Sequence, residues 1–190
     1  MESRTRARPG GRSEQVRLRV ANVCLDLLAA GDADFGPAEV ARRSGVSRAT
    51  VHRWWPTKAD LVREALTLHT RSLAAPDTGT WSGDLQAFAA QLAEFFADPV
   101  EVSQNVLMAS GAHPDYTSAV LEHYQPLFAD WRTMLARAVD RGDIAPNVDF
   151  DAILRLLLAP LLLEPLLYRR TLTHRELNDH VTLVLRATAA

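Results

Sequence analysis

A glycine-containing turn between two short helical segments, within the window from Val40 to Leu61, constrains the fold more than any other feature of the sequence. The first segment opens at Pro37, which suits the first position of a helix because no N–H partner is needed there. Gly45 can adopt the backbone angles that a tight turn requires. The second segment runs from Arg48 to Trp54. Two short helices joined in this way predict a helix-turn-helix, in which the first helix braces the second.

Capping residues mark where these helices begin. Ser47 can cap the second segment, and Thr57 with Asp60 forms a capping box for the helix that follows. Ala41 is small enough to let the two short helices cross closely. The residues expected to anchor the second segment on its inner side are Val46, Val51 and Trp55.

Apolar residues recur at three- and four-residue spacing along most of the remaining chain, as is typical of amphipathic helices. The pattern predicts a first helix from about Glu14 with Ser13 as its cap, and a fifth helix from about Asp84 to Ala97. Thr173 and Glu176 predict a capping box for the last helix. We expect an all-α fold of about nine helices, with an N-terminal three-helix helix-turn-helix head and a C-terminal helical bundle.

Charge divides the chain into two unlike parts. Residues 1–60 hold 11 basic and 7 acidic side chains, whereas residues 61–190 hold 10 basic and 16 acidic side chains. A net charge of +4 on the first part and −6 on the second is expected if only the first part meets a polyanion. The position of the helix-turn-helix in the basic part favours nucleic acid as that polyanion.

Composition argues against several other classes of protein. No apolar run approaches the roughly 20 residues of a membrane span, and the arginine-rich start lacks the apolar core of an export signal. The single cysteine, Cys24, excludes an intrachain disulfide framework and lies on an apolar stripe, where a buried thiol is expected. No nucleophile elbow, phosphate loop, paired-carboxylate motif or metal triad is present. We expect a cytoplasmic protein that is not an enzyme and has no cofactor.

The window resembles the DNA-binding signature of the TetR family of bacterial repressors. The matching residues, without a gap, are Val40-Ala41, Ser44-Gly45-Val46-Ser47, Thr50-Val51, Trp55, Thr57-Lys58 and Leu61. The resemblance implies a homodimeric repressor that binds an operator in double-stranded DNA and is released by a small-molecule effector. The sequence departs from the family at His52, where a tyrosine that meets a phosphate is most common, at Trp54, and at Gly36-Pro37, which replaces a capping threonine.

The resemblance also implies how individual side chains meet DNA. Arg48, Ala49 and Arg53 are expected to face base edges, because arginine pairs with guanine and alanine can contact the thymine methyl group. The implied phosphate contacts are Ser47, Thr50, His52, Trp54 and Lys58. For Trp54, packing within the head is an equal alternative.

The acidic remainder resembles the ligand-binding and dimerisation domain of the family. We expect a flexible basic arm over residues 1–13, the DNA-binding domain over 14–60, and the ligand-binding and dimerisation domain over 61–190. The candidate pocket residues combine apolar area with a few polar tips and are Phe88, Leu92, Phe95, Phe96, Met108, His113, Tyr116, Tyr124, Trp131 and Met134. They favour a small, largely apolar effector, although packing in the core explains any one of them equally well.

The segment 149–170 is apolar almost all round, more than one buried face requires, which predicts a dimer interface there and on the last helix. The candidate interface residues are Leu156, Leu163, Leu167, Leu177, Val181, Val184 and Leu185. A central core helix is the alternative for this segment. For Glu164 within the apolar run the sequence leaves two possibilities open: it pairs across the interface with an arginine such as Arg155, Arg169 or Arg170, or it faces the pocket.

Other functions are less favoured by the sequence. A helical metabolite-binding protein or enzyme that does not act on DNA is one alternative, and an activator or architectural DNA-binding protein is another. His113, His123 and Asp115 could be imagined as metal ligands, but their spacing fits no compact motif. We therefore expect no metal site.

Overall fold

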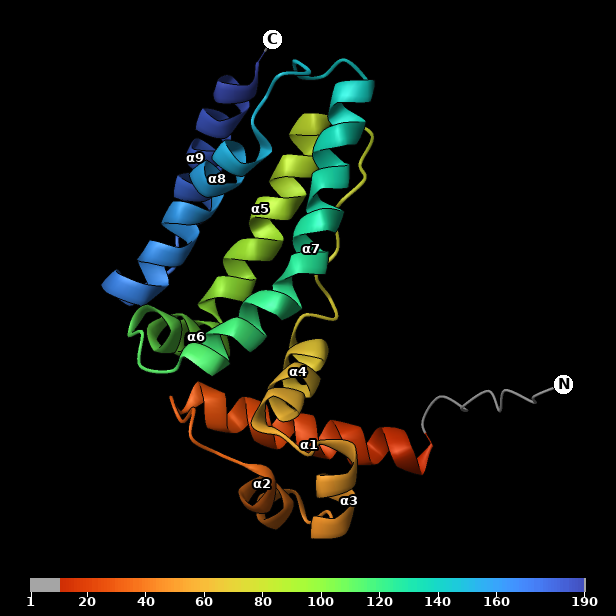
Figure 1. The fold of residues 1–190 in the computed structure, drawn as a ribbon. Helices are drawn as coiled ribbons and strands as arrows, with labels where there is room; N and C mark the ends of the chain where they lie inside the picture. The colour runs from red at the N-terminus through yellow and green to blue at the C-terminus, as the bar shows by residue number, and fades with distance from the viewer. Residues whose placement is uncertain (1–10, 190) are drawn as a thin grey trace, which may run out of the picture.

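The computed structural model describes residues 11–189, and its regular elements are helices (Figure 1). They are α1 (Arg12–Ala29), α2 (Pro37–Ser44), α3 (Arg48–Trp54), α4 (Lys58–His69), α5 (Trp81–Ala97), α6 (Pro99–Ala109), α7 (Pro114–Asp140), α8 (Phe150–Leu163), the π-helix η1 (Glu164–Tyr168) and α9 (His174–Thr188). Nine α-helices and no strand within residues 11–189 confirm the all-α fold class predicted from the sequence. No helix in this range has both the length and the apolar character needed to cross a bilayer.

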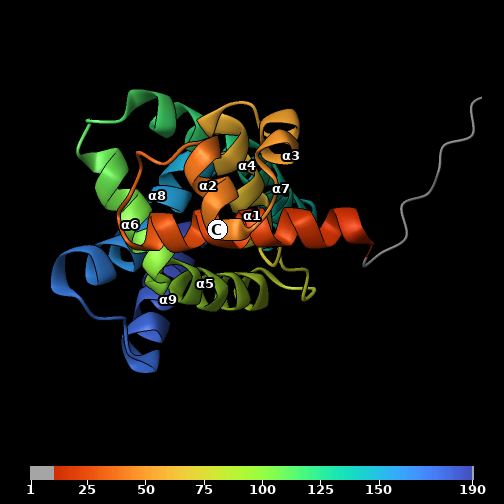
Figure 2. The same cartoon turned by 90° about the horizontal axis from the view of Figure 1, so that it is seen from below.

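The head lies at one end of the molecule and contains the helix-turn-helix. α1 runs across the end of the body and packs against α4, while α2 and α3 pack on each other at the outer end (Figures 1 and 2). One stripe of α1 is buried at Val20, Cys24, Leu27 and Leu28, as its apolar spacing predicts. α3 is thereby placed at the far end of the head from the body.

The body is a bundle of long helices. α5, α7, α8 and α9 run side by side, and α6 lies between this bundle and the head (Figure 1). α5 contacts α9, α8, α6 and α7, so it is the central helix. Its inward positions Leu85, Phe88 and Leu92 are completely buried, which explains why the 81–97 segment is so apolar.

Two separate contacts join the head to the body. α1 packs on α6, where the Ser103 hydroxyl donates a hydrogen bond of 2.9 Å to the Ala29 carbonyl oxygen. α4 packs along α7, where the Thr70 hydroxyl lies 2.9 Å from the His123 Nε2 atom. Burial lowers the pKa of His123, which favours the neutral ring that can share this hydrogen bond. The head is therefore attached to the body through two of its own helices, α1 and α4.

The start of α1 differs from the prediction. α1 begins at Arg12, with Gly11 as its N-cap and no side-chain cap, so the predicted Ser13 cap is wrong. Ser13 lies inside the first turn, because the helix extends further towards the N-terminus than its apolar stripe. Residues 1–10 of the predicted basic arm lie outside the described residues, and Arg12 and Ser13 belong to α1.

The start of α5 also lies earlier than Asp84. The Thr80 hydroxyl accepts a hydrogen bond of 3.1 Å from the Gly83 N–H and caps a helix that begins at Trp81. Glycine is a poor helix former, which made this stretch look like a loop. The Trp81 side chain is buried and its Nε1–H donates to the Thr188 hydroxyl at 2.8 Å. This contact with α9 fixes a turn that local propensity does not favour.

Asp84 ties the start of α5 to the end of α7. Its carboxylate accepts hydrogen bonds from the Thr78 N–H at 2.6 Å, from the Thr78 hydroxyl at 2.8 Å and from the Arg141 guanidinium at 3.1 Å. Burial opposes ionisation of Asp84, but these three donors outweigh it and hold the pKa below its usual value. Asp84 is thus a buried, fully engaged carboxylate.

Other local predictions are confirmed. Both capping boxes form, with Thr57 and Asp60 at the start of α4 and Thr173 and Glu176 at the start of α9. Cys24 is buried, and this burial, with a smaller effect of Glu64, raises the pKa of its thiol to about 12. A thiol in that state is structural rather than reactive.

Candidate nucleic-acid interface

The recognition helix of the head is α3, and its two sides differ in burial. Val51 and, just beyond the helix, Trp55 are buried in the head core. Arg48, Ala49 and Arg53 are exposed, and so are Ser47, His52 and Trp54. The inner side holds the helix in place and the outer side is free to meet another molecule.

The turn before α3 depends on Gly45. Its φ of 66° lies in the left-handed region that L side chains avoid, and a Cβ added there would meet no atom within 4 Å. Val46 then turns inward and is buried, and Ser47 caps α3 by accepting a hydrogen bond of 3.2 Å from the Thr50 N–H. The sequence Ser44-Gly45-Val46-Ser47 thus sets the direction in which α3 leaves the turn.

The cations of the head fall into two groups. Arg42 and Arg43 on α2 both contact the Glu39 carboxylate, each at 2.6 Å. The Arg42 and Arg43 hydrogen bonds hold the pKa of Glu39 at about 2, so all three charges persist and one of the two positive charges is compensated. Within residues 11–189, Arg48 and Arg53 on α3 make no hydrogen bond or ion pair. The recognition helix therefore carries two positive charges that no acid among the described residues compensates.

Smaller donors lie at the edges of α3. The Thr50 hydroxyl lies 2.8 Å from the Ser47 hydroxyl at the N-terminal end of the helix. Lys58 opens α4, next to the Thr57 cap, and its Nζ lies 3.9 Å from the exposed Asp34 carboxylate. Exposed N–H groups at a helix start attract phosphate, so Lys58 and the start of α4 favour the same anion.

Trp54 lies at the end of α3 and is 40% exposed. Its ring meets the buried Trp55 ring edge-on, with centroids 5.5 Å apart. One face of Trp54 is thus packed against the head and the rest is open to a partner. Packing of Trp54 within the head is thus present in part, and its contact with a phosphate stays a prediction.

Sequence reasoning missed Arg19. A hollow of about 440 Å³ opens between α1 and α3, lined by Arg12, Ser13, Val16, Arg19, Gly45, Val46, Ser47, Thr50 and Trp54. Arg12 and Arg19 lie seven residues apart, so they share one face of α1. That spacing could have indicated a second basic wall beside the recognition helix.

The inner end of α3 is held by a partly buried acid. Glu64 on α4 accepts a hydrogen bond of 3.1 Å from the Trp55 indole N–H. The same carboxylate accepts two hydrogen bonds of 2.9 Å from Arg17 on α1. Glu64 therefore links three helices at the point where the chain leaves α3.

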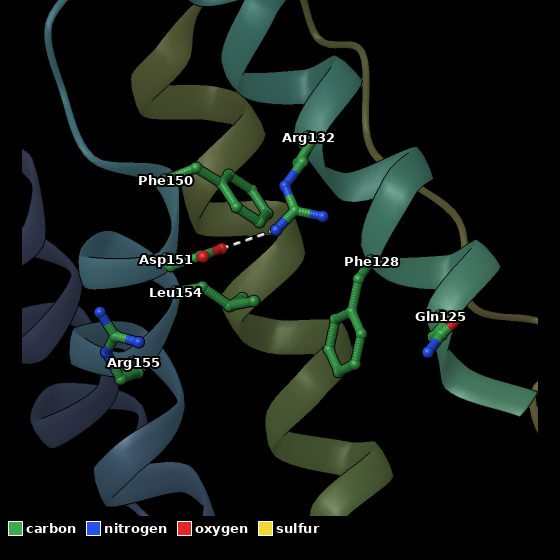
Figure 3. A pocket seen from close by; sticks show the side chains of 7 residues that line it. All are labelled: Gln125, Phe128, Arg132, Phe150, Asp151, Leu154 and Arg155. Carbon is green, nitrogen blue, oxygen red and sulfur yellow. Dashed lines mark hydrogen bonds and ion pairs between the residues drawn. The ribbon is translucent and has the colours of Figure 1, made fainter. Parts of the chain in front are cut away.

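The ten candidate pocket residues mostly fill the core of the body. Those that are buried are Phe88, Leu92, Phe95, Tyr116, Tyr124, Trp131 and Met134. The Phe88 and Trp131 rings pack edge-to-face with centroids 4.9 Å apart, and Phe96 and Met108 pack against the same core. His113 points elsewhere, with its Nδ1 3.7 Å from the Asp34 carboxylate of the head. None of the ten lines the cleft that opens between α7 and α8 (Figure 3).

The polar tips among these residues belong to one buried hydrogen-bond network. The Glu101 carboxylate accepts from the Tyr124 hydroxyl at 2.7 Å and from the Gln104 amide at 3.1 Å. The Tyr116 hydroxyl donates to the Gln104 carbonyl oxygen at 3.2 Å, and His69 Nε2 lies 3.1 Å from Glu101. Burial and the nearby Glu101 raise the pKa of Tyr124, so its hydroxyl stays protonated and donates. The hydrogen bonds among Glu101, Gln104, Tyr116 and Tyr124 thus occupy their polar tips, whereas His69 Nε2 lies near Glu101 without a hydrogen bond to it.

The candidate dimer residues divide into two sets. Leu156, Leu163 and Leu167 on α8 and η1 are exposed, the last by 63%. Leu177, Val181 and Val184 are buried within the same chain, so their placement at an interface is wrong, and Leu185 is partly buried. Their stripe on α9 packs inward on α8 and α5 because these helices need it for their own core.

Glu164 pairs with Arg170 of the same chain, at 2.7 Å between Oε2 and Nε. Arg170 also contacts Glu176, so one guanidinium connects η1 to the capping box of α9. Within the described residues of this chain Glu164 is not paired with Arg155 or Arg169, and a pairing across a dimer interface stays a prediction.

Comparison with protein families identifies the body. The family model described as "Tetracyclin repressor-like, C-terminal domain" matches residues 75–184. The chain belongs to the TetR family. A second model, described as the IclR helix-turn-helix domain, matches residues 23–54, which span the end of α1 through α3. The family resemblance expected from the sequence is confirmed, and this TetR-family chain is a DNA-binding transcriptional regulator rather than an enzyme.

Relatives and solved structures agree with this assignment. The uncharacterized HTH-type transcriptional regulator YdeS of Bacillus subtilis (strain 168) is 27% identical over 178 residues, covering 92% of this chain and 86% of that protein. The HTH-type transcriptional regulator AqdR of Rhodococcus erythropolis is 27% identical over 141 residues, covering 73% and 68%. The TetR family transcription regulator SCO0332 superposes with a TM-score of 0.70 at 25% identity, covering 93% of this chain and 100% of that one. A TetR transcriptional regulator from Agrobacterium tumefaciens gives 0.72 at 16% identity, covering 95% and 96%.

Proposed function

We propose that this chain is a homodimeric repressor that binds a two-fold symmetric operator in double-stranded DNA and leaves it when a small, largely apolar ligand binds. The observation that carries the proposal is the exposed, uncompensated pair of arginines on α3. Arg48 and Arg53 have no acidic partner among the described residues, whereas Arg42 and Arg43 on the bracing helix share Glu39. Leaving two guanidiniums free on one short helix is favourable when a polyanion receives them.

In this proposal α3 enters the major groove. Arg48, Ala49 and Arg53 read base edges, and Ser47, Thr50, His52, Trp54 and Lys58 contact phosphates. Arg12 and Arg19 extend the phosphate-binding surface along α1. The DNA-binding domain comprises residues 14–60 and the ligand-binding and dimerisation domain residues 61–190, with α4 running across the boundary.

The dimer is formed by α8, η1 and α9. Support comes from large apolar side chains left exposed on these three adjoining elements, namely Leu156, Leu163, Leu167, Tyr168 and Leu183. A single chain gains nothing by exposing such residues together, whereas a symmetric partner would cover them. The two-fold axis of such a dimer would relate the two heads, which would then bind two half-sites about 34–36 Å apart.

The DNA arm of the proposal is tested by selecting binding sites from a random DNA library and measuring affinity with the wild type and three variants. Arg48→Ala is expected to relax sequence preference at one position in each half-site, because a bidentate arginine–guanine pair discriminates by about 1–3 kcal/mol. Lys58→Ala is expected to weaken all sites alike and to reduce the salt slope by about one. Arg42→Ala serves as the control, since Arg42 is already paired with Glu39. If no specific site emerges, the proposed function is refuted.

The dimer arm is tested by sedimentation at equal protein concentrations. Leu163→Glu is expected to give a monomer, because it places a charge in the proposed apolar interface. Leu121→Glu is the matched control, since Leu121 is exposed on α7, a helix outside the proposed interface. A dimer that survives Leu163→Glu would contradict this placement of the interface. Expression of a reporter in a deletion strain then gives the sign of regulation.

A further inference from the structure

The body contains a cleft between α7 and α8 (Figure 3). The proposed function does not say which kind of ligand this cleft would bind. Its volume is about 510 Å³, within the range of about 300–1,000 Å³ typical of small-molecule sites. The lining residues are Gln125, Phe128 and Arg132 from α7, and Phe150, Asp151, Leu154 and Arg155 from α8. α5 runs behind the opening (Figure 3).

The apolar part of the cleft is made by Phe128, Phe150 and Leu154. Each of them is only partly buried, although the core beside them is filled. The Phe128 ring stands edge-on to the buried Trp131 ring, with centroids 5.2 Å apart, and points towards the opening (Figure 3). A flat apolar group inserted here would cover these faces without displacing the core.

The charges of the cleft are unequally matched. Asp151 is the one acid among the lining residues, and its Oδ1 accepts a hydrogen bond of 2.7 Å from Arg132. The Arg132 guanidinium also lies over the Phe150 ring, 4.8 Å from its centroid, which fixes it at one end of the cleft. Arg155 lies one helical turn after Asp151 and has no hydrogen bond or ion pair with any residue in 11–189. The cleft therefore carries one positive charge that the chain does not compensate.

We propose that this cleft binds an aromatic carboxylate, with the carboxylate on Arg155 and the aromatic part against Phe128, Phe150 and Leu154. Arginine pairs with a carboxylate through two parallel hydrogen bonds. The ligand needs only one carboxylate, because the other arginine of the cleft, Arg132, is already paired with Asp151. Binding of this ligand does not depend on the proposed function; only its role as the effector that releases DNA rests on that function. Its binding would join α7, which packs on α4 of the head, to α8.

Direct titration of the full chain in the absence of DNA tests the site. The probes are 2-naphthoate and its neutral analogue 2-naphthamide, followed by isothermal titration calorimetry. The wild type is expected to bind one naphthoate per chain, about tenfold more tightly than the amide, because charge-assisted hydrogen bonds are the stronger kind. Arg155→Gln is expected to remove this preference. Arg186→Gln, which changes an exposed arginine of α9 outside the cleft, is the matched control and should leave it unchanged.

A second variant reverses the sign of the effect. Asp151→Asn frees the Arg132 guanidinium and is expected to tighten naphthoate binding about threefold while leaving the amide unaffected. If Asp151 had a purely structural role, its replacement would not tighten naphthoate binding. Equal binding of acid and amide by the wild type, or an unchanged preference in Arg155→Gln, would overturn the proposal. A changed sedimentation coefficient in Arg155→Gln would assign Arg155 to an interface instead, which also overturns it. Loss of operator binding alone would refute the proposed function and not this site.

Discussion

Replacing Glu64 by alanine is expected to loosen the recognition helix from the rest of the head without touching any exposed side chain of α3. The substitution removes the hydrogen bond to the Trp55 indole at 3.1 Å and both hydrogen bonds to Arg17 at 2.9 Å. The Trp55 side chain is 4% exposed, so its N–H would be left without a protein partner. Stranding a buried donor destabilises the folded state by about 1–3 kcal/mol.

The Arg17 contribution is smaller. The Arg17 side chain is 59% exposed, and exposed ion pairs contribute about 0.2–1 kcal/mol. Together the two losses amount to about 1–4 kcal/mol of unfolding free energy. For a chain of this length each kcal/mol lowers the unfolding midpoint by about 2–4 °C, so Glu64→Ala is expected to lower it by about 2–16 °C.

Thermal unfolding followed by circular dichroism, at one protein concentration for all variants, measures these shifts. Glu64→Gln keeps an oxygen that can accept the hydrogen bond from Trp55. It is therefore expected to lower the midpoint by less than half as much as Glu64→Ala. Arg17→Ala is the control for the ion pair and is expected to lower the midpoint by about 1–3 °C. If Arg17→Ala lowers the midpoint as much as Glu64→Ala does, the hydrogen bond to Trp55 is not what Glu64 contributes to stability. That result would refute the reasoning.

Two further predictions concern buried groups. Because the pKa of Asp84 lies below its unfolded value of about 3.9, its stabilisation is complete above that pH and is lost as the pH falls through the folded pKa. Urea unfolding should therefore show Asp84→Asn destabilised at pH 7 and the difference from wild type shrinking at pH 3; an equal difference at both would contradict it. Cys24 is buried with its pKa raised to about 12, so Ellman's reagent at pH 8 should modify it only after denaturation, and fast labelling of folded protein would disprove its burial.

The recognition helix could be predicted from the sequence because its determinants are local. Gly45 sets the turn, Ser47 caps α3, and the spacing of Val51 and Trp55 places their side chains on one face. None of these requires knowledge of a distant part of the chain. The capping box at Thr57 is equally local.

The cleft between α7 and α8 could not be predicted, because periodicity shows which face of a helix is apolar but not how well that face is filled. Phe88 and Tyr124 look like ligand contacts in the sequence, yet their space is occupied by Trp131 and by the Glu101 network. The cleft instead contains Phe128, whose position depends on how far α7 stands from α8. The early start of α5 has the same cause, since Trp81 is fixed by Thr188, far away in the chain.

The double joint between head and body limits how this protein can be recombined with its relatives. A chimera cut at residue 60 would divide α4 in its first turn and would leave the Ala29 carbonyl oxygen without Ser103. A cut after residue 70 would keep α4 whole but would also separate Thr70 from His123. Moving the whole head onto another body is therefore expected to give poorly folded hybrids unless the matching faces of α6 and α7 are moved with it. The exposed side of α3 makes no contact that such an exchange would disturb. If α3 reads bases as proposed, operator specificity is expected to transfer by exchanging its exposed side chains rather than the whole head.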